Sequence, residues 1–170
     1  LSDLPKDIEG IDNIEILIID DGSTDNTSQV AKNFGVNHIV SIPENKGLAN
    51  AYIQGIDACL KAGADIIVNT DADNQYNADD IEKIVRPIVD NRAEIVIGTR
   101  PISQTEHFSY LKKKLQKIGS WVVRYASQTD VEDAPSGFRA VSRDAAIKLY
   151  VFNKHTYTLE TIIQAGQSGM

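Results

Sequence analysis

The sequence is poor in sulfur and has no long apolar run, and each of these absences excludes a class of protein. Its 170 residues include one cysteine and one methionine, so no intramolecular disulfide can form and a disulfide-stapled secreted domain is excluded. No stretch of about 18 apolar residues occurs and no signal-peptide pattern opens the chain. We therefore expect no transmembrane helix, a reducing compartment and a cytoplasmic location.

Positive charge is also scarce. The formal net charge is -7 and the pI is near 4.9, which argues against general nucleic-acid binding through phosphates. Hydrophobic residues make up 42% of the chain, enough for one domain over residues 1–170 with a real core. The single cysteine, Cys59, shares the apolar side of a helical pattern with Tyr52 and Ile56. We interpret it as a core residue rather than a nucleophile.

Apolar runs rich in Ile and Val alternate with helical patterns along the chain. The runs occupy residues 14–19, 38–42, 65–70 and 94–99, and the helical patterns occupy 25–34, 47–62 and 78–91. Such near-continuous hydrophobicity is typical of strands covered on both faces in a parallel sheet. The alternation predicts βαβ units and an α/β fold with a mostly parallel sheet. Ligands of such sheets bind beyond the carboxyl ends of the strands.

The first polar cluster at a predicted strand end is IIDDGSTDNT. Asp20 and Asp21 end the strand, Gly22 turns the chain, and Ser23 or Thr24 can cap the next helix. A turn needs only one carboxylate. We therefore predict that Asp20 or Asp21 contacts a ligand.

The second cluster is NTDADNQY. Asp71, Asp73 and Gln75 alternate, so in extended chain their side chains point the same way. Oxygen ligands at alternate positions suit Mg²⁺ or Mn²⁺, with substrate phosphates completing the shell. An EF-hand loop would need Gly where Tyr76 stands, and a haloacid-dehalogenase motif would need Thr or Val in place of Gln75. The open alternative is a polar turn before a helix.

Two further segments carry polar groups after apolar stretches. In EIVIGTRP, Arg100 follows the fourth predicted strand and could hold a phosphate bidentately, or form a surface ion pair. In VEDAPSGFRAVSRD, residues 131–144, the spacing predicts only a loop, a strand and a capped helix. No Gly-x-Gly-x-x-Gly follows any strand, which disfavours a dinucleotide oxidoreductase.

Taken in order, IIDDGSTD, ENKGLANA, DADNQY, GTR and DAPSGFRAVSR resemble the family 2 glycosyltransferases. The resemblance is strongest to the branch with dolichol-phosphate mannose synthase and polyprenyl-phosphate glucosyltransferases. It is collinear from about residue 14 to the end of the chain. Each motif alone is weakly or moderately specific, whereas all five in this order are a strong signal.

The resemblance implies a Rossmann-like GT-A fold and an inverting, metal-assisted transfer of a hexose from a UDP- or GDP-sugar to a polyprenyl phosphate. It implies nucleotide-sugar contacts from Asp20, Asp21, Gly47 and Asp71. It implies a Mg²⁺ or Mn²⁺ ion held by Asp71, Asp73 and Gln75.

On the acceptor side, the resemblance assigns phosphate or acceptor contacts to Arg100, Ser136 and Arg139. A lipid phosphate is already an anion, so cationic side chains would matter more than a base. A sugar hydroxyl would need a base, for which Asp133 is the candidate. Transfer to a growing glycan and a non-catalytic nucleotide- and metal-binding module remain the alternatives.

The ends of the chain and two departures from the family pattern distinguish this sequence. The chain starts at Leu1, and its one methionine is Met170. The family's first strand, which helps to hold the nucleotide, should precede this sequence. We therefore expect a fragment, cut before the first strand and at the C-terminus. The family's Arg residues after the GTR-like segment are replaced by KKKLQK.

The segment 108–127 concentrates positive charge in an acidic chain. It contains Lys112, Lys113, Lys114, Lys117 and Arg124 and no acidic residue. Apolar residues recur in it at helical spacing. A basic amphipathic helix of this kind can lie on an anionic membrane, which would place the protein at the cytoplasmic face. The alternative is an ordinary surface helix with its apolar side on the core.

Overall fold

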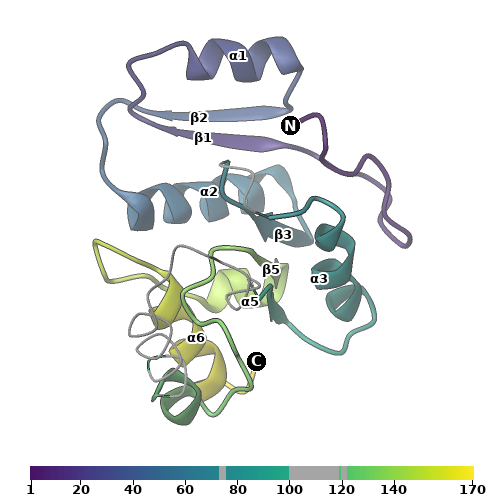
Figure 1. Ribbon diagram of the computed structural model, residues 1–170, viewed down its shortest axis with the longest axis vertical. Coiled ribbons are helices and arrows are strands. Elements are labelled where there is room, and N and C mark those ends of the chain that lie inside the picture. Colours follow the sequence, from purple (N-terminus) through teal and green to yellow (C-terminus); the bar gives the residue numbers. More distant parts are fainter. Residues whose placement is uncertain (73–75, 100–118, 120–121) are drawn as a thin grey trace, which may run out of the picture.

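The computed structural model describes residues 1–72, 76–99, 119 and 122–170. Strands and helices alternate through its first half, which confirms the predicted α/β class (Figure 1). The elements are β1 (Leu17–Asp21), α1 (Thr27–Phe34), β2 (His38–Ile42), α2 (Leu48–Ala62), β3 (Ile66–Asn69), α3 (Asp80–Val89), β4 (Ile95–Ile97), β5 (Arg139–Ser142), α5 (Arg143–Lys148) and α6 (Thr158–Gln167). The first strand begins and ends later than predicted, and Asp20 and Asp21 are its last two residues. No sequence pattern had indicated α6.

The described strands form two sheets. In the first, β1 pairs with β2 in parallel, from Leu17 opposite His38 to Asp21 opposite Ile42. In the second, β5 lies between β3 and β4 and is antiparallel to both. The prediction of a mostly parallel sheet is therefore wrong for the described residues. The reason is that β5 returns through the middle of the sheet, and its partners are set by long-range packing that a local pattern does not encode.

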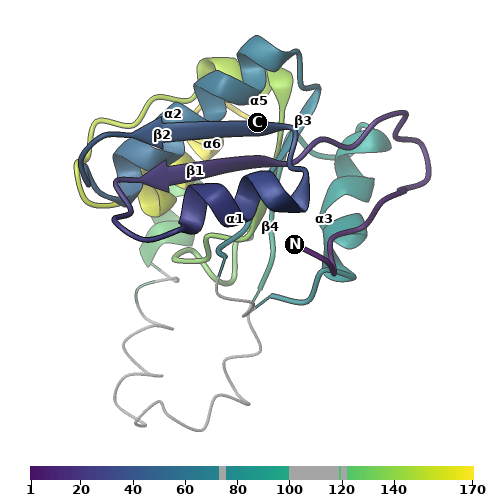
Figure 2. The same ribbon diagram turned by 90° about the horizontal axis from the view of Figure 1, so that it is seen from above.

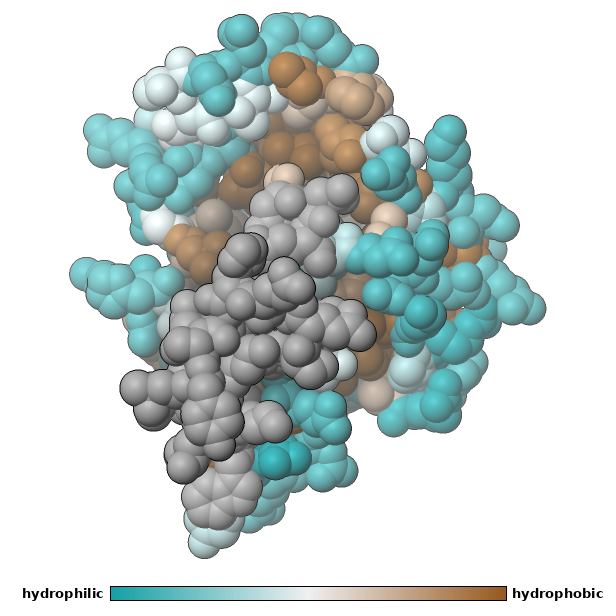
Figure 3. Space-filling model, viewed as in Figure 1, coloured by the Kyte–Doolittle hydropathy of each residue, from teal (hydrophilic) through white to brown (hydrophobic). Residues whose placement is uncertain are grey.

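Helices α1 and α2 cover opposite faces of the β1–β2 sheet, as both views show (Figures 1 and 2). The α2 contact is close because Gly55 has no side chain. A Cβ at that position would lie 3.3 Å from the side chain of Ile19 on β1. The apolar residues of β1 remain only partly buried, and Figure 3 shows hydrophobic surface in this part of the molecule, bordered by hydrophilic residues.

The second sheet is covered on both faces and holds most of the core. On one face, α3 packs four buried residues against Phe138 and Ala140: Ile81, Ile84, Val85 and Ile88. On the other face, α2 and α5 pack against Ile67 and Val141. Cys59 is partly buried and packs against this second cluster, and burial raises the pKa of the thiol. The predicted packing of Cys59 on the apolar side of its helix is confirmed, although the residue is only partly buried.

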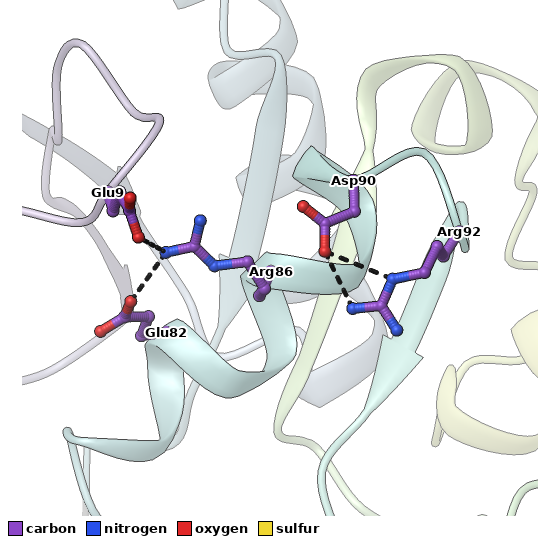
Figure 4. Close-up of polar contacts among 5 residues, drawn as sticks. All are labelled: Glu9, Glu82, Arg86, Asp90 and Arg92. Carbon is purple, nitrogen blue, oxygen red and sulfur yellow. Dashed lines mark hydrogen bonds and ion pairs between the residues drawn. The ribbon is translucent and has the colours of Figure 1, made fainter.

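The N-terminal segment is fastened to α3 before it enters β1. Ile8 is buried in the α3 cluster. Beside it, one Arg86 nitrogen lies 3.0 Å from Glu9 and 2.9 Å from Glu82 (Figure 4). Exposed pairs of this kind contribute little individually, about 0 to 1 kcal/mol. The buried apolar contact therefore carries most of the attachment.

Most of the basic segment 108–127 lies outside the described residues. Its last part, residues 122–127, is helical. Val123 and Ser127 are buried there, whereas Tyr125 is 80% exposed and Val122 is 50% exposed. Among the residues that the structure describes, no helix has both the length and the apolarity needed to cross a bilayer.

Candidate active site at the carboxyl ends of β1 and β3

The two aspartates that end β1 have different environments. Asp20 is 7% exposed. It accepts a 2.9 Å hydrogen bond from the backbone amide of Ser23 and a second from the hydroxyl of Ser28. The Ser28 and then the Ser23 hydrogen bonds hold the pKa of Asp20 below its usual value. Asp20 therefore fixes the turn into α1, and its predicted nucleotide contact remains untested.

The cap of α1 also differs from the prediction. The helix begins at Thr27, too late for Ser23 or Thr24 to cap it. Asp25 instead accepts a 2.9 Å hydrogen bond from the backbone amide of Thr27. The N-cap residue is Asn26, and its side chain makes no capping hydrogen bond.

Asp21 joins the end of β1 to the loop before α2. One carboxylate oxygen accepts a hydrogen bond from the amide of Lys46 and the other from the amide of Gly47, each at 3.0 Å. Gly22 makes the approach possible, because a Cβ there would lie 2.6 Å from the backbone nitrogen of Asn45. Its φ of +77° also favours glycine. Two predicted donor-site residues, Asp21 and Gly47, are thus in contact.

An open groove adjoins this contact. Its volume is about 260 Å³, and it is lined by Lys46, Asn50 and Ile53 on one side and by residues 151–154 on the other. The opposite loop is fixed by Glu160 of α6, which accepts hydrogen bonds from two of its amides at 3.1 Å. The groove therefore places two lysines, at 46 and 154, beside the Asp21 contact. The sequence analysis had not singled out either lysine.

The other carboxylate of interest, Asp71, follows the end of β3 and is exposed. Its two oxygens lie 3.0 and 3.3 Å from the point where a Cβ on Gly137 would stand. The amide nitrogen of Asn69, at the end of β3, donates to the carbonyl oxygen of Gly137 at 2.8 Å and to the hydroxyl of Tyr157 at 2.9 Å. The segment 136–138 (the SGF loop) is thereby held against Asp71, the first aspartate of the Asp71/Asp73 pair.

The predicted metal site is described only in part, because Asp73 and Gln75 lie outside the described residues. Within the ranges that the structure describes, no group of three His, Cys, Asp or Glu side chains could hold a metal. Asp71 is nevertheless suitably placed: its carboxylate is exposed beyond a strand end, and the missing side chain of Gly137 leaves room for it. Two carboxylates and an amide oxygen are the hard donors that Mg²⁺ or Mn²⁺ prefers. The residues fit such an ion.

The predicted acceptor residues are buried where they are described. Asp133 and Arg139 are each 1% exposed and Ser136 is fully buried. Arg139 donates to the hydroxyl of Thr161 at 2.8 Å and to the carbonyl oxygen of Ser136, and burial lowers its pKa. In this arrangement Arg139 ties the SGF loop to α6. Arg100 lies outside the described residues.

A pair of stacked tyrosines links α2 to α6 beneath these groups. The rings of Tyr52 and Tyr157 are parallel within 2°, with centroids 3.7 Å apart. The guanidinium of Arg139 lies 5.0 Å from the centroid of the Tyr157 ring. Sequence reasoning missed this pair, because 105 positions separate two tyrosines that belong to no motif. Only the helical pattern around Tyr52 indicated that it was buried.

The model of the family described as Glycosyl transferase family 2 matches residues 6–153. The chain is 36% identical over 149 residues to the UDP-N-acetylglucosamine–dolichyl-phosphate N-acetylglucosaminyltransferase of Methanococcus voltae, covering 76% of this chain and 59% of that protein. It is 31% identical over 139 residues to the dolichol-phosphate mannosyltransferase of Pyrococcus furiosus, covering 78% and 38%.

Among solved structures, glucosyl-3-phosphoglycerate synthase of Mycobacterium tuberculosis in complex with phosphoglyceric acid superposes with a TM-score of 0.69 at 18% identity. The match covers 91% of this chain and 55% of that one. The same enzyme has been solved with Mn²⁺, UDP-glucose and phosphoglyceric acid, with a TM-score of 0.62 at 21% identity over 82% and 50% of the two chains. This likeness establishes the fold, and the chain spans about half the length of these proteins. By its match over most of its length, the chain belongs to glycosyl transferase family 2.

Proposed function

We propose that this chain is the donor-binding core of an inverting glycosyltransferase that moves a hexose from a UDP- or GDP-sugar to a polyprenyl phosphate. One observation carries the proposal: the hydrogen bonds of Asp21 with the amides that open α2. These bonds join the end of β1 to the start of α2. Tyr52 of α2 stacks on Tyr157, whose hydroxyl accepts a hydrogen bond from Asn69 at the end of β3, two residues before Asp71. A chain of contacts thus connects two carboxylates at different strand ends, Asp21 and Asp71, a pair suited to a nucleoside diphosphate and its metal.

In this proposal Asp71, Asp73 and Gln75 hold a Mg²⁺ or Mn²⁺ ion. The ion would neutralise charge that builds on the leaving diphosphate, acting as a Lewis acid. Solved structures of the same fold with Mn²⁺ and UDP-glucose support this choice. Lys46 and Lys154 add positive charge in the adjoining groove, where they would attract the anionic donor.

A lipid phosphate is favoured as acceptor over a sugar hydroxyl. Two relatives at 36% and 31% identity are named as dolichyl-phosphate transferases. In addition, the side chain of Asp133, the one candidate base for a hydroxyl acceptor, is 1% exposed. A phosphate acceptor is already an anion and needs orientation rather than deprotonation. Arg100 is proposed to provide that orientation as a bidentate phosphate ligand.

The acceptor would be reached at a membrane surface. The basic residues of segment 108–127 and the exposed Val122 and Tyr125 at its end support contact with anionic lipid headgroups on the cytoplasmic side. The ordinary surface-helix alternative would leave the same residues without effect on vesicle binding.

Calorimetry tests the donor assignment. UDP, GDP and their glucose and mannose conjugates are titrated into the wild type and Asp73→Ala, with and without Mn²⁺. We expect metal-dependent binding of one nucleotide class, lost in Asp73→Ala. Metal-independent binding, equal in both proteins, would contradict the proposed site. Absence of binding for every probe would contradict it as well.

Product analysis tests the acceptor. The enzyme and labelled donor are offered a polyprenyl phosphate and, separately, soluble sugar acceptors. Label in the lipid fraction alone supports the proposal, and label on a sugar supports glycan synthesis. A protein that binds donor and metal but transfers to neither supports the binding-only alternative.

A further inference from the structure

The hydrogen bonds of Asn69 determine the role of the Tyr157 hydroxyl. Gly137 offers a carbonyl oxygen, which can only accept, so the Asn69 atom 2.8 Å away must be the amide nitrogen. The same nitrogen lies 2.9 Å from the hydroxyl oxygen of Tyr157. Its second hydrogen therefore points at that oxygen, and Tyr157 acts as the acceptor in this bond.

The proton of the Tyr157 hydroxyl consequently remains available to another acceptor. A tyrosine hydroxyl carries its proton at neutral pH, so this proton can be donated. The hydroxyl oxygen lies 3.3 Å from the point where a Cβ on Gly137 would stand, and the nearer oxygen of Asp71 lies 3.0 Å from the same point. The Tyr157 hydroxyl and the Asp71 carboxylate therefore both lie beside Gly137, which has no side chain to separate them.

The ring of Tyr157 is held rigidly. The residue is 1% exposed and stacks on Tyr52, and Arg139 lies against the ring at 5.0 Å. Tyr157 also directly precedes α6, where its carbonyl oxygen accepts the hydroxyl of Thr161 at 2.8 Å. A side chain fixed on both faces and at its backbone can hold a partner in one orientation.

We propose that Tyr157 is a positioning residue that orients the carboxylate of Asp71 for its metal and donor. This inference rests on the proposed function, since it assumes that Asp71 is a metal ligand. In this proposal the Tyr157 hydroxyl would donate to one Asp71 oxygen when the metal is bound, which would leave the other oxygen for the ion. Groups that orient ligands in this way typically change metal affinity by about 10- to 100-fold when removed.

Tyr52 provides a matched control. Both tyrosines belong to the same buried stack, but the Tyr52 hydroxyl has no hydrogen-bond partner among the described residues. Tyr52→Phe and Tyr157→Phe therefore remove the same atom from neighbouring rings, and only Tyr157→Phe removes a hydroxyl that is bonded to Asn69 and lies near Asp71. Gly137→Ala is a second probe, because its Cβ would press on the Asp71 oxygens and on the Tyr157 hydroxyl, the two groups whose relation is tested.

The experiment measures Mn²⁺ affinity from the electron paramagnetic resonance signal of the free ion, with Mn²⁺ alone and with UDP or GDP present. Tyr157→Phe and Gly137→Ala are expected to weaken Mn²⁺ binding about 10-fold or more. Tyr52→Phe should remain within about twofold of the wild type, because its hydroxyl is unpaired. Nucleotide affinity without metal should not change, which a general loss of structure would not reproduce. Melting curves establish that each variant is folded.

The possible failures are distinguishable. If the wild type binds Mn²⁺ and Asp71→Asn does not, but Tyr157→Phe and Gly137→Ala bind like the wild type, the positioning role is overturned and the proposed function stands. If Tyr52→Phe weakens binding as much as Tyr157→Phe, the effect belongs to the stack and the inference is overturned. If Asp71→Asn binds Mn²⁺ as tightly as the wild type, the metal site and the positioning role are both wrong.

Discussion

Asp21 accepts a hydrogen bond of 3.0 Å from the backbone amide of Gly47, 26 residues further along the chain. Its other oxygen accepts from the neighbouring amide of Lys46. A single carboxylate therefore closes the end of β1 onto the start of α2. The second aspartate of the DDGS motif supports the fold as well as any ligand.

Asp21→Asn tests this closure. The asparagine offers one acceptor oxygen, so its NH₂ group faces a backbone N–H and one charge-assisted hydrogen bond is lost. We expect the free energy of unfolding in urea to fall by about 1 to 2 kcal/mol. Asp57→Asn, which breaks only an exposed pair with Lys61, should cost less than about 0.5 kcal/mol. Equal effects of the two substitutions would show that the closure does not stabilise the fold.

Gly22→Ala and Gly35→Ala separate backbone strain from crowding. The two glycines have nearly identical φ angles, +77° and +76°, so the left-handed conformation costs each alanine about 1 to 2 kcal/mol. Only at Gly22 does the new Cβ meet backbone, 2.6 Å from Asn45; at Gly35 nothing lies within 4 Å. Gly22→Ala should therefore lose about 1 to 3 kcal/mol more in urea unfolding. Equal losses would mean that the 44–45 loop moves away freely.

Asp20 should make stability depend on acid pH. Its folded pKa lies below the ordinary value of 3.8, so the unfolded chain binds a proton more readily than the native state. The contribution of Asp20 is present above pH 3.8 and is lost as the pH falls through that value toward its folded pKa. Urea midpoints between pH 7 and 3 should fall less steeply in Asp20→Asn. Ser28→Ala, which removes the main hydrogen bond to Asp20, should act in the same direction, and an unchanged slope in both would refute this role.

The basic segment predicts a salt-dependent membrane contact. Each lysine near an anionic surface contributes about 1 kcal/mol, so Lys112/Lys113/Lys114→Ala should weaken binding to phosphatidylserine vesicles about 100-fold. Added salt should reduce wild-type binding in sedimentation assays. Lys32, on α1, provides a control substitution outside the segment. Binding that neither salt nor the triple substitution changes would remove the membrane role.

The sequence predicted elements and clusters better than it predicted environments. Strand ends and helices could be located because their apolar periodicity is local. The different environments of Asp20 and Asp21 could not be predicted, because Asp20 is fixed by Ser28 and Asp21 by Gly47, contacts that only the folded turn creates. From sequence the two carboxylates are equivalent.

Long-range pairing accounts for the remaining differences. The segment before Arg139 was correctly expected to lead into a strand, but its antiparallel position between β3 and β4 depends on partners about 70 and 40 residues away. The Tyr52–Tyr157 stack is similar, since neither residue lies in a recognisable motif. Burial of Arg139 was also unexpected, because arginine is rarely fully buried, and here α6 supplies its acceptors.

The division of the described strands into two sheets has a consequence for amide hydrogen exchange. Asp21 ends a strand of one sheet, Asp71 follows a strand of the other, and no backbone pairing joins the two sheets within the described residues. Sheets that are hydrogen-bonded separately can open separately, each with its own protection against exchange. A donor that contacts both aspartates adds binding free energy that is lost when either sheet opens. In the free protein we therefore expect amide exchange rates to differ between the β1–β2 sheet and the β3–β5–β4 sheet. Once nucleotide sugar and metal are bound, exchange in both sheets should slow.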